Sequence, residues 1–244
     1  NCMEYGINYF SEHKKVSALL GIFSTHLIYK NFFSNYKHLY LRYYFLNQGK
    51  CTHTLNTSLT FIKRSVFEKF RGFDINIKSV ISEDAELGMR LTENCYIIHQ
   101  SKKLEMEHMK YYSFRDFLNT EFVRSKRIFI AFANKFLEEE KKKRNGNFFF
   151  FRPINIYLSI PLVYLMIFSF ILSGLHSIFL LIGFILLMLF IIANFDFWML
   201  IRKERNLLFS IKASFVNFLS MVWMGIGIIC ALFELIPKFL NKHV

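Results

Sequence analysis

Residues 82–91 read Ser82-Glu83-Asp84-Ala85-Glu86-Leu87-Gly88-Met89-Arg90-Leu91, with three carboxylates in four positions at the start. The apolar residues that follow have helical spacing, and Ser82 is a residue type that caps helices. Two interpretations fit this pattern. The acids either stabilise the positive first turn of a helix, or one of them is an oriented carboxylate that acts as general base for a hydroxyl nucleophile.

The flanking segments alternate between strand and helix patterns. Val16–Phe23 is a short apolar run that suits a buried strand, and residues 27–48 carry aromatic side chains at helical spacing. Residues 51–62 alternate β-branched and polar types, which predicts one strand. A short helix is expected to end at Gly72, and residues 95–98 predict another strand. The N-terminal half is therefore expected to be a mixed α/β fold.

The last third of the chain has the composition of a membrane protein. The hydrophobic fraction of the whole chain is 53%, with 31 phenylalanines, and much of this material follows residue 153. Three predicted transmembrane helices cover residues 154–173, 178–200 and 214–236. Each is long enough for a hydrocarbon layer of about 30 Å. An all-α transmembrane segment is therefore expected over residues 153–237.

Charge indicates how this segment is oriented. Lys and Arg outnumber Asp and Glu by 31 to 18, for a net charge of +13. That excess suits an anionic membrane surface, and with hydrophobic spans present we reject nucleic acid as the partner. Basic residues at 141–144 and 202–212 predict an integral protein of the cytoplasmic (inner) membrane, with its N-terminal part in the cytoplasm and its C-terminus outside.

Two lysines, Lys238 and Lys242, oppose the outside placement of the C-terminus. In the alternative interpretation, the third apolar segment re-enters the membrane or lies at its interface, which Gly225 and Gly227 permit. The four cysteines form no Cys-x-x-Cys pair, so we expect a reducing compartment.

Several short segments share their order and spacing with a known family. Besides residues 82–91, they are Leu55-Asn56-Thr57-Ser58, Lys63-Arg64-Ser65-Val66-Phe67, Gly72-Phe73-Asp74, Leu104-Glu105-Met106-Glu107-His108 and Phe122-Val123-Arg124-Ser125-Lys126-Arg127. Together they resemble the second half of a family 2 glycosyltransferase catalytic domain. The resemblance runs from about Tyr5 to Phe129. It implies part of a GT-A fold over residues 1–130. From composition and charge, residues 131–152 are expected to form an amphipathic, basic juxtamembrane linker before the transmembrane segment.

The resemblance assigns roles by position. Asp84 would be the general base that takes the proton of the acceptor hydroxyl, and Glu83 would orient it or line the acceptor site. Asn56 falls at a substrate-binding position. His108 would lie near the donor diphosphate and act as a metal ligand. Arg124 and Arg127 would neutralise the leaving diphosphate.

The chain also departs from the family pattern. It contains no Asp-x-Asp, the family's metal motif, so a divalent cation (Mg²⁺ or Mn²⁺) is expected to bind mostly through a missing N-terminal half. Residues 1–244 alone are then expected to be inactive. The processive synthases' Gln-x-x-Arg-Trp is also absent, which argues against a polymer synthase.

The expected function is that of a membrane-bound inverting glycosyltransferase. It would move a sugar from a nucleotide-diphosphate donor to a hydroxyl of a lipid or glycan acceptor, lipid-linked or part of a surface polysaccharide, at the cytoplasmic membrane face. The alternative is a non-catalytic membrane scaffold or docking module derived from a degenerate transferase, whose acids only cap helices. Fold alone does not fix a substrate.

Overall fold

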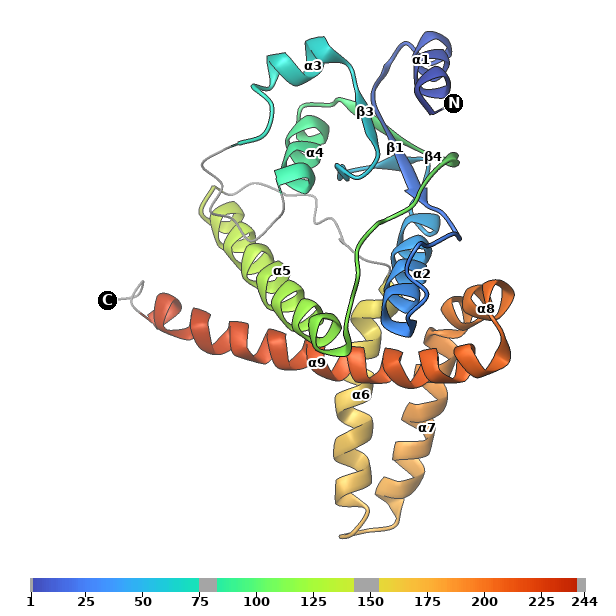
Figure 1. The fold of residues 1–244 in the computed structure, drawn as a ribbon. Helices are drawn as coiled ribbons and strands as arrows, with labels where there is room; N and C mark the ends of the chain where they lie inside the picture. Colours follow the sequence, from blue (N-terminus) through green and yellow to red (C-terminus); the bar gives the residue numbers. More distant parts are fainter. Residues whose placement is uncertain (1, 75–82, 143–153, 241–244) are drawn as a thin grey trace. The chain divides into compact units, whose positions relative to one another are not determined.

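The structure is a computed structural model that describes residues 2–74, 83–142 and 154–240 (Figure 1). Contacts divide the chain into two compact units. The first comprises residues 1–31 and 38–111, and the second residues 32–37 and 112–244. Helix α2 (Phe32–Leu46) therefore contributes to both. The predicted domain boundary at residue 130 remains a prediction, and the contact boundary falls at Tyr112 instead.

The first unit contains a four-stranded sheet of order β2-β4-β1-β3. The strands are β1 (Val16–Phe23), β2 (Cys51–Thr52), β3 (Thr60–Ile62) and β4 (Ile97–Met106). β1 and β4 are parallel neighbours, and the two short strands add antiparallel to their outer edges. All eight residues of β1 are buried, as expected for a central strand that reads as a continuous apolar run.

Three more helices belong to this unit: α1 (Cys2–Glu12), α3 (Arg64–Lys69) and α4 (Glu83–Glu93). Leu87 and Leu91 on α4 pack against Ala18 of β1 and Ile98 of β4 in a buried cluster. The mixed α/β fold, the buried strand at 16–23 and a helix over the acidic stretch are thus confirmed. Ser82 lies outside the described residues.

The prediction of one strand over residues 51–62 is wrong. β2 ends at Thr52 and β3 begins at Thr60, and a loop separates them. The loop is closed by its own polar groups, because the Thr60 hydroxyl donates to the main-chain oxygen of Asn56 at 2.6 Å and the amide of Ser58 donates to Asn56 Oδ1 at 3.0 Å. These local bonds compete with strand pairing.

The described part of the second unit is helical, apart from short connections. It contains α5 (Phe114–Lys142), α6 (Ile154–Leu172), α7 (Ile178–Ala193), α8 (Phe195–Glu204) and α9 (Leu207–Leu240). Helices α6 and α7 form an antiparallel hairpin, and α9 packs along α5 and lies across the hairpin (Figure 1). The predicted linker at 131–152 begins inside α5, and residues 143–153 lie outside the described residues.

In the described part of the chain, α6 and residues 207–236 of α9 are long and apolar enough to cross a membrane. Helices α7 and α8 meet the same test only as a pair, bent by 54°. The first predicted span agrees with α6, and the third lies inside α9. The second, at 178–200, is wrong as a continuous helix because it breaks at Asn194.

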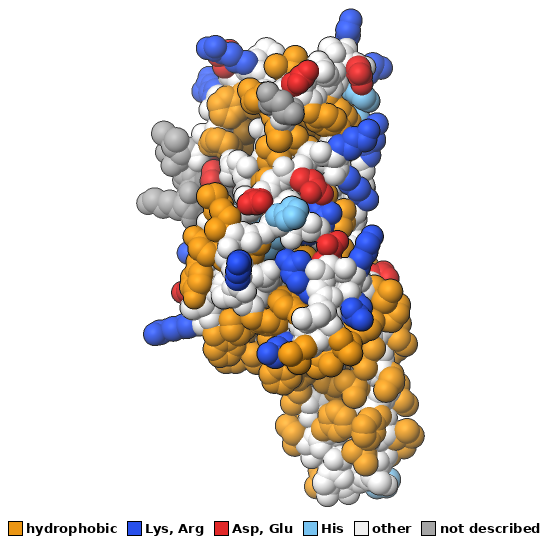
Figure 2. Space-filling model, turned by 45° about the vertical axis from the view of Figure 1, so that its right-hand side comes forward, with side chains coloured by type: hydrophobic (Ala, Val, Ile, Leu, Met, Phe, Trp, Pro, Cys, Tyr) orange, Lys and Arg blue, Asp and Glu red, His pale blue; other side chains and the backbone are white. Residues whose placement is uncertain are grey.

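The α6–α7 hairpin presents hydrophobic side chains and contains no Lys, Arg, Asp or Glu (Figure 2). Its outward residues include Phe168, 59% exposed, and Ile192, 69% exposed. An uncharged exposed surface of this size is typical of contact with lipid. The helices therefore have the features of a membrane protein.

Candidate active site around Asp84

Asp84 is the second residue of α4, where the main-chain amides of the first helical turn point outward. Its Oδ2 accepts hydrogen bonds from the amide of Thr57 at 3.0 Å and from the Thr57 hydroxyl at 3.2 Å. Its Oδ1 accepts one from the amide of Ala85 at 2.7 Å. Three donors and the positive end of the helix therefore orient a half-buried carboxylate.

Gly88 makes this arrangement sterically possible. It lies one helical turn after Asp84, and a Cβ at this position would lie only 2.7 Å from the main chain of Thr54. With no side chain on Gly88, the loop can touch the helix. Leu55 is then buried in the core cluster with Leu87, and the next residues of the loop bring Thr57 to the carboxylate.

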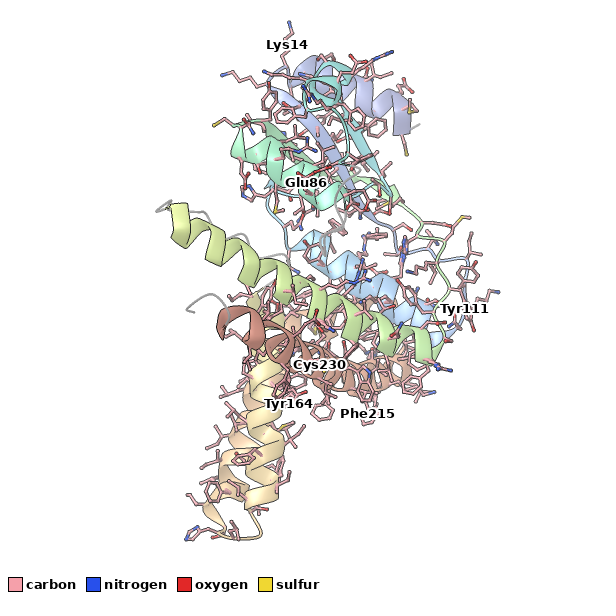
Figure 3. The ribbon with its side chains drawn as sticks, turned by 90° about the vertical axis from the view of Figure 1, so that its left-hand side faces the viewer. Lys14, Glu86, Tyr111, Tyr164, Phe215 and Cys230 are labelled. Atoms are coloured by element: carbon pink, nitrogen blue, oxygen red, sulfur yellow. The ribbon has the colours of Figure 1, made fainter. Side chains whose placement is uncertain are left out.

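The third acid of the stretch, Glu86, has a structural role. It forms an ion pair with Arg90 one turn later, with bonds of 2.9 and 3.0 Å. Arg90 also donates to the carbonyl oxygens of Phe70 and, at 2.8 Å, of Gly72. Gly72 has a φ of +64°, so it supplies the left-handed turn after α3. Glu86, labelled on α4 in Figure 3, thus helps to anchor this turn to α4.

Glu83 is exposed at the first position of α4, next to Asp84. The hydrogen bonds that orient Asp84 come from Thr57 and from the amide of Ala85. Asn56 precedes Thr57, and its side-chain oxygen is engaged in the turn to Ser58. The structure therefore brings Asp84, Thr57 and Asn56 together. An acceptor-lining role for Glu83 and a substrate-binding role for Asn56 remain predictions.

His108 follows the carboxyl end of β4, beside the carboxyl end of its parallel neighbour β1. Its ring meets the ring of Phe23 edge-on, with 5.2 Å between centroids. This edge of a parallel sheet is where ligands bind in open α/β folds. Among the described residues, no group of three or more His, Cys, Asp or Glu side chains could hold a metal ion. The metal and diphosphate roles of His108 remain predictions.

Arg124 and Arg127 belong to the second unit. Both are exposed on α5, and their separation of three residues places them on one face of the helix. Burial raises the pKa of the Tyr112 hydroxyl, and the positive charge of Arg124 offsets part of that rise. The pair is thus an exposed basic patch, as its proposed contact with a diphosphate requires.

Sequence reasoning missed Thr57 and Gly88. Thr57 carried no signal of its own, because a threonine beside an asparagine in a loop is common. Gly88 did carry one, since a glycine inside a helical pattern suggests that another chain segment approaches closely.

Comparison of the chain with protein-family models, curated proteins and solved structures found no match.

Proposed function

We propose that the chain is the C-terminal part of a membrane-bound inverting glycosyltransferase that uses a nucleotide-diphosphate sugar. The observation that carries the proposal is the Asp84 carboxylate, oriented by Thr57 at the start of α4. A general base must be ionised, fixed in direction and open to its substrate. Asp84 is half-buried and its neighbour Glu83 is exposed, so an acceptor hydroxyl can approach it.

In this proposal Asp84 accepts the proton of the acceptor hydroxyl while that oxygen bonds to the anomeric carbon of the sugar. The bond from the anomeric carbon to the diphosphate breaks, and its electron pair leaves with the nucleoside diphosphate. Arg124 and Arg127 are the cationic groups of this chain that would stabilise the leaving charge. The expected Mg²⁺ or Mn²⁺ would stabilise the same charge.

The membrane helices support a lipid-linked or surface-polysaccharide acceptor, because substrate and enzyme would then meet at the cytoplasmic membrane face. This part of the proposal rests on α6 and α9, which are long and apolar enough to enter a bilayer.

The test uses the full-length protein in membranes, a panel of sugar nucleotides and either Mg²⁺ or Mn²⁺. Nucleoside diphosphate release is compared for wild type, Asp84→Asn and the control Glu107→Gln, which changes an exposed acid after β4. We expect Asp84→Asn to lower turnover by about 10²–10⁴-fold while donor binding persists. Unchanged turnover would remove the base assignment.

A second candidate function is the non-catalytic scaffold. The observation that favours it is that both oxygens of Asp84 already accept hydrogen bonds from the protein, which suits an acid that only joins the loop to the helix. A scaffold predicts that Asp84→Asn lowers the melting temperature and that no sugar nucleotide binds to the full-length protein.

A further inference from the structure

The outward side of α9 is apolar from Leu208 to Ile236. Phe215 is 67% exposed and Phe233 is 70% exposed. We call this side the outer stripe. Its residues recur every three or four positions and are Leu208, Ile211, Phe215, Leu219, Val222, Ile226, Ile229, Phe233 and Ile236.

The opposite side of α9, which faces the protein, is rich in small and polar residues. Ser210, Asn217 and Ser220 are buried there, as are Ala213, Gly227 and Ala231, beside the larger apolar residues Val216, Met221, Met224 and Leu235. A helix that packs on a core and faces water would instead carry polar side chains on its outward side. Large apolar groups outside and small or polar groups inside are typical of a helix that contacts lipid.

Helix α5 runs along the inner side of α9. Gly227 lies against Ser125 and the main chain of Phe122, so closely that a Cβ would collide with both. Farther along, the ammonium group of Lys126 pairs with the carboxylate of Glu234 at 2.6 Å, and both side chains are partly exposed. The contact between α5 and α9 is therefore extended and partly ionic.

This contact argues against a membrane-crossing position for α9. Between Phe114 and Arg127, α5 carries six charged residues: Arg115, Asp116, Glu121, Arg124, Lys126 and Arg127. Charged side chains inside a bilayer are costly and rare. If α9 crossed the membrane, it would draw this part of α5 into the hydrocarbon layer. A position at the surface leaves α5 in water.

The α6–α7 hairpin indicates how α9 is oriented relative to the membrane. Helix α9 crosses α6 at Tyr164, whose hydroxyl donates to the carbonyl oxygen of Val222 at 2.7 Å and whose ring lies against Gly225. In Figures 1 and 3, α9 lies across the α6–α7 hairpin and not beside it. If the uncharged hairpin points into the bilayer, α9 lies in the plane of the membrane surface.

Exposed basic residues flank the start of α9. Arg202 and Lys203 are in the last turn of α8, and Lys212 is in the second turn of α9. Cationic side chains beside an apolar stripe are typical of helices that lie in the interface of an anionic membrane.

We propose that α9 is an in-plane helix, whose outer stripe is buried at the headgroup–acyl boundary of an anionic bilayer, and that, among the described helices, only α6 and α7 enter the membrane core. The C-terminus then lies on the same side of the membrane as α5. The proposal does not depend on sugar transfer.

The first experiment measures depth along α9. The full-length protein receives single cysteines at Phe215, Ile226 or Phe233 after Cys2, Cys51, Cys95 and Cys230 are changed to alanine. Each cysteine is labelled with a small fluorophore in vesicles of phosphatidylcholine and phosphatidylglycerol, and quenching is measured with lipids brominated at shallow or deep acyl positions. Positions 215 and 233 are about 27 Å apart along a helix.

An in-plane α9 gives all three probes the same shallow depth, within a few ångströms. A depth that changes progressively from 215 to 233 would overturn the proposal in favour of a crossing helix. Probes that no brominated lipid quenches would also overturn it, because a protein partner or a second copy would then cover the outer stripe.

The second experiment does not require the stripe to be altered. Native Cys95 is exposed, and no apolar span separates it from α5 along the chain. One variant keeps Cys95 as its single cysteine, and a second variant carries a single cysteine appended after Val244. The reaction of each with a membrane-impermeant maleimide is measured in sealed vesicles. We expect both to react from the same face, and reaction from opposite faces would refute the in-plane position.

Discussion

At the scale of single residues, the candidate site around Asp84 depends on a small set of side chains with different structural roles. Glu86 is engaged by Arg90, and Asn56 shapes the loop that contains it. Thr57 holds Asp84 by its main-chain amide and by its hydroxyl, so Thr57 is a positioning residue for the proposed base.

The hydroxyl bond can be removed without the amide bond. Thr57→Val deletes a hydrogen bond to a charged group, which contributes about 1.5–3 kcal/mol, and about 1.4 kcal/mol corresponds to tenfold in rate. We expect kcat for nucleoside diphosphate release from the full-length protein to fall roughly tenfold or more. Thr57→Ser restores the hydroxyl and should restore the rate, whereas Ser58→Ala should leave it unchanged. Equal rates for the valine and serine variants would contradict the positioning role.

At the scale of elements, Asn194 explains why the predicted span at 178–200 breaks into α7 and α8. Its Nδ2 donates to the carbonyl oxygen of Phe190 at 2.9 Å and to Ser159 Oγ at 2.8 Å. Its Oδ1 accepts from Asn217 Nδ2 at 2.9 Å, and Asn217 in turn accepts from the Tyr36 hydroxyl at 3.1 Å. A buried polar chain thus joins α2, α6 and α9 at the bend.

Replacement of this asparagine leaves the buried amide group of Asn217 without its acceptor. Asn194→Leu therefore costs about 1–3 kcal/mol for that group, whereas the Ser159 hydroxyl loses one hydrogen bond and still donates to the carbonyl oxygen of Asn155. We expect a clear drop in the melting temperature of the protein in detergent micelles. The neighbouring change Ile192→Leu alters an exposed side chain and should leave that temperature unchanged. A wild-type melting temperature for Asn194→Leu would show that the polar chain does not stabilise the bend.

Hydrophobic periodicity correctly predicted the helices and strands that depend on their own residues. It failed where contacts with residues distant in sequence determine the local structure. Val16–Phe23, α4 and α6 each follow from an uninterrupted run of their own residues. The break at Asn194 depends on Asn217, 23 positions away. The position of the loop within residues 51–62 against α4 depends on its contact with Gly88. In the candidate site, Asp84 could be proposed from its place in the acidic stretch, but Thr57 could be found only once the loop and the helix were placed together.

At the scale of the whole molecule, α2 is the element that the two units share, since residues 32–37 belong to the second unit and 38–46 to the first. Within the second unit, its Lys37 forms an ion pair with Glu121 of α5, and both side chains are 1% exposed. Tyr36, the preceding residue, donates to Asn217 of α9. Within the second unit, residues 32–37 of α2 are therefore fixed to α5 and α9 by buried polar contacts.

A buried ion pair adds little stability compared with a pair of apolar side chains of similar volume. Removal of one partner alone is strongly destabilising, because the other charge stays buried. Glu121→Gln leaves the ammonium group of Lys37 buried without its counter-charge, and we expect a loss of about 3–5 kcal/mol, measured as a lower melting temperature in micelles. The double change Lys37→Met with Glu121→Leu removes both charges and fills a similar volume, so its melting temperature should return toward that of wild type. Arg64→Gln, which breaks an exposed pair with Glu68, should change the temperature little because surface pairs contribute about 0–1 kcal/mol. If the double variant melted lower than Glu121→Gln, the charges themselves would stabilise this junction, and the pair would be a net source of stability at the base of α2.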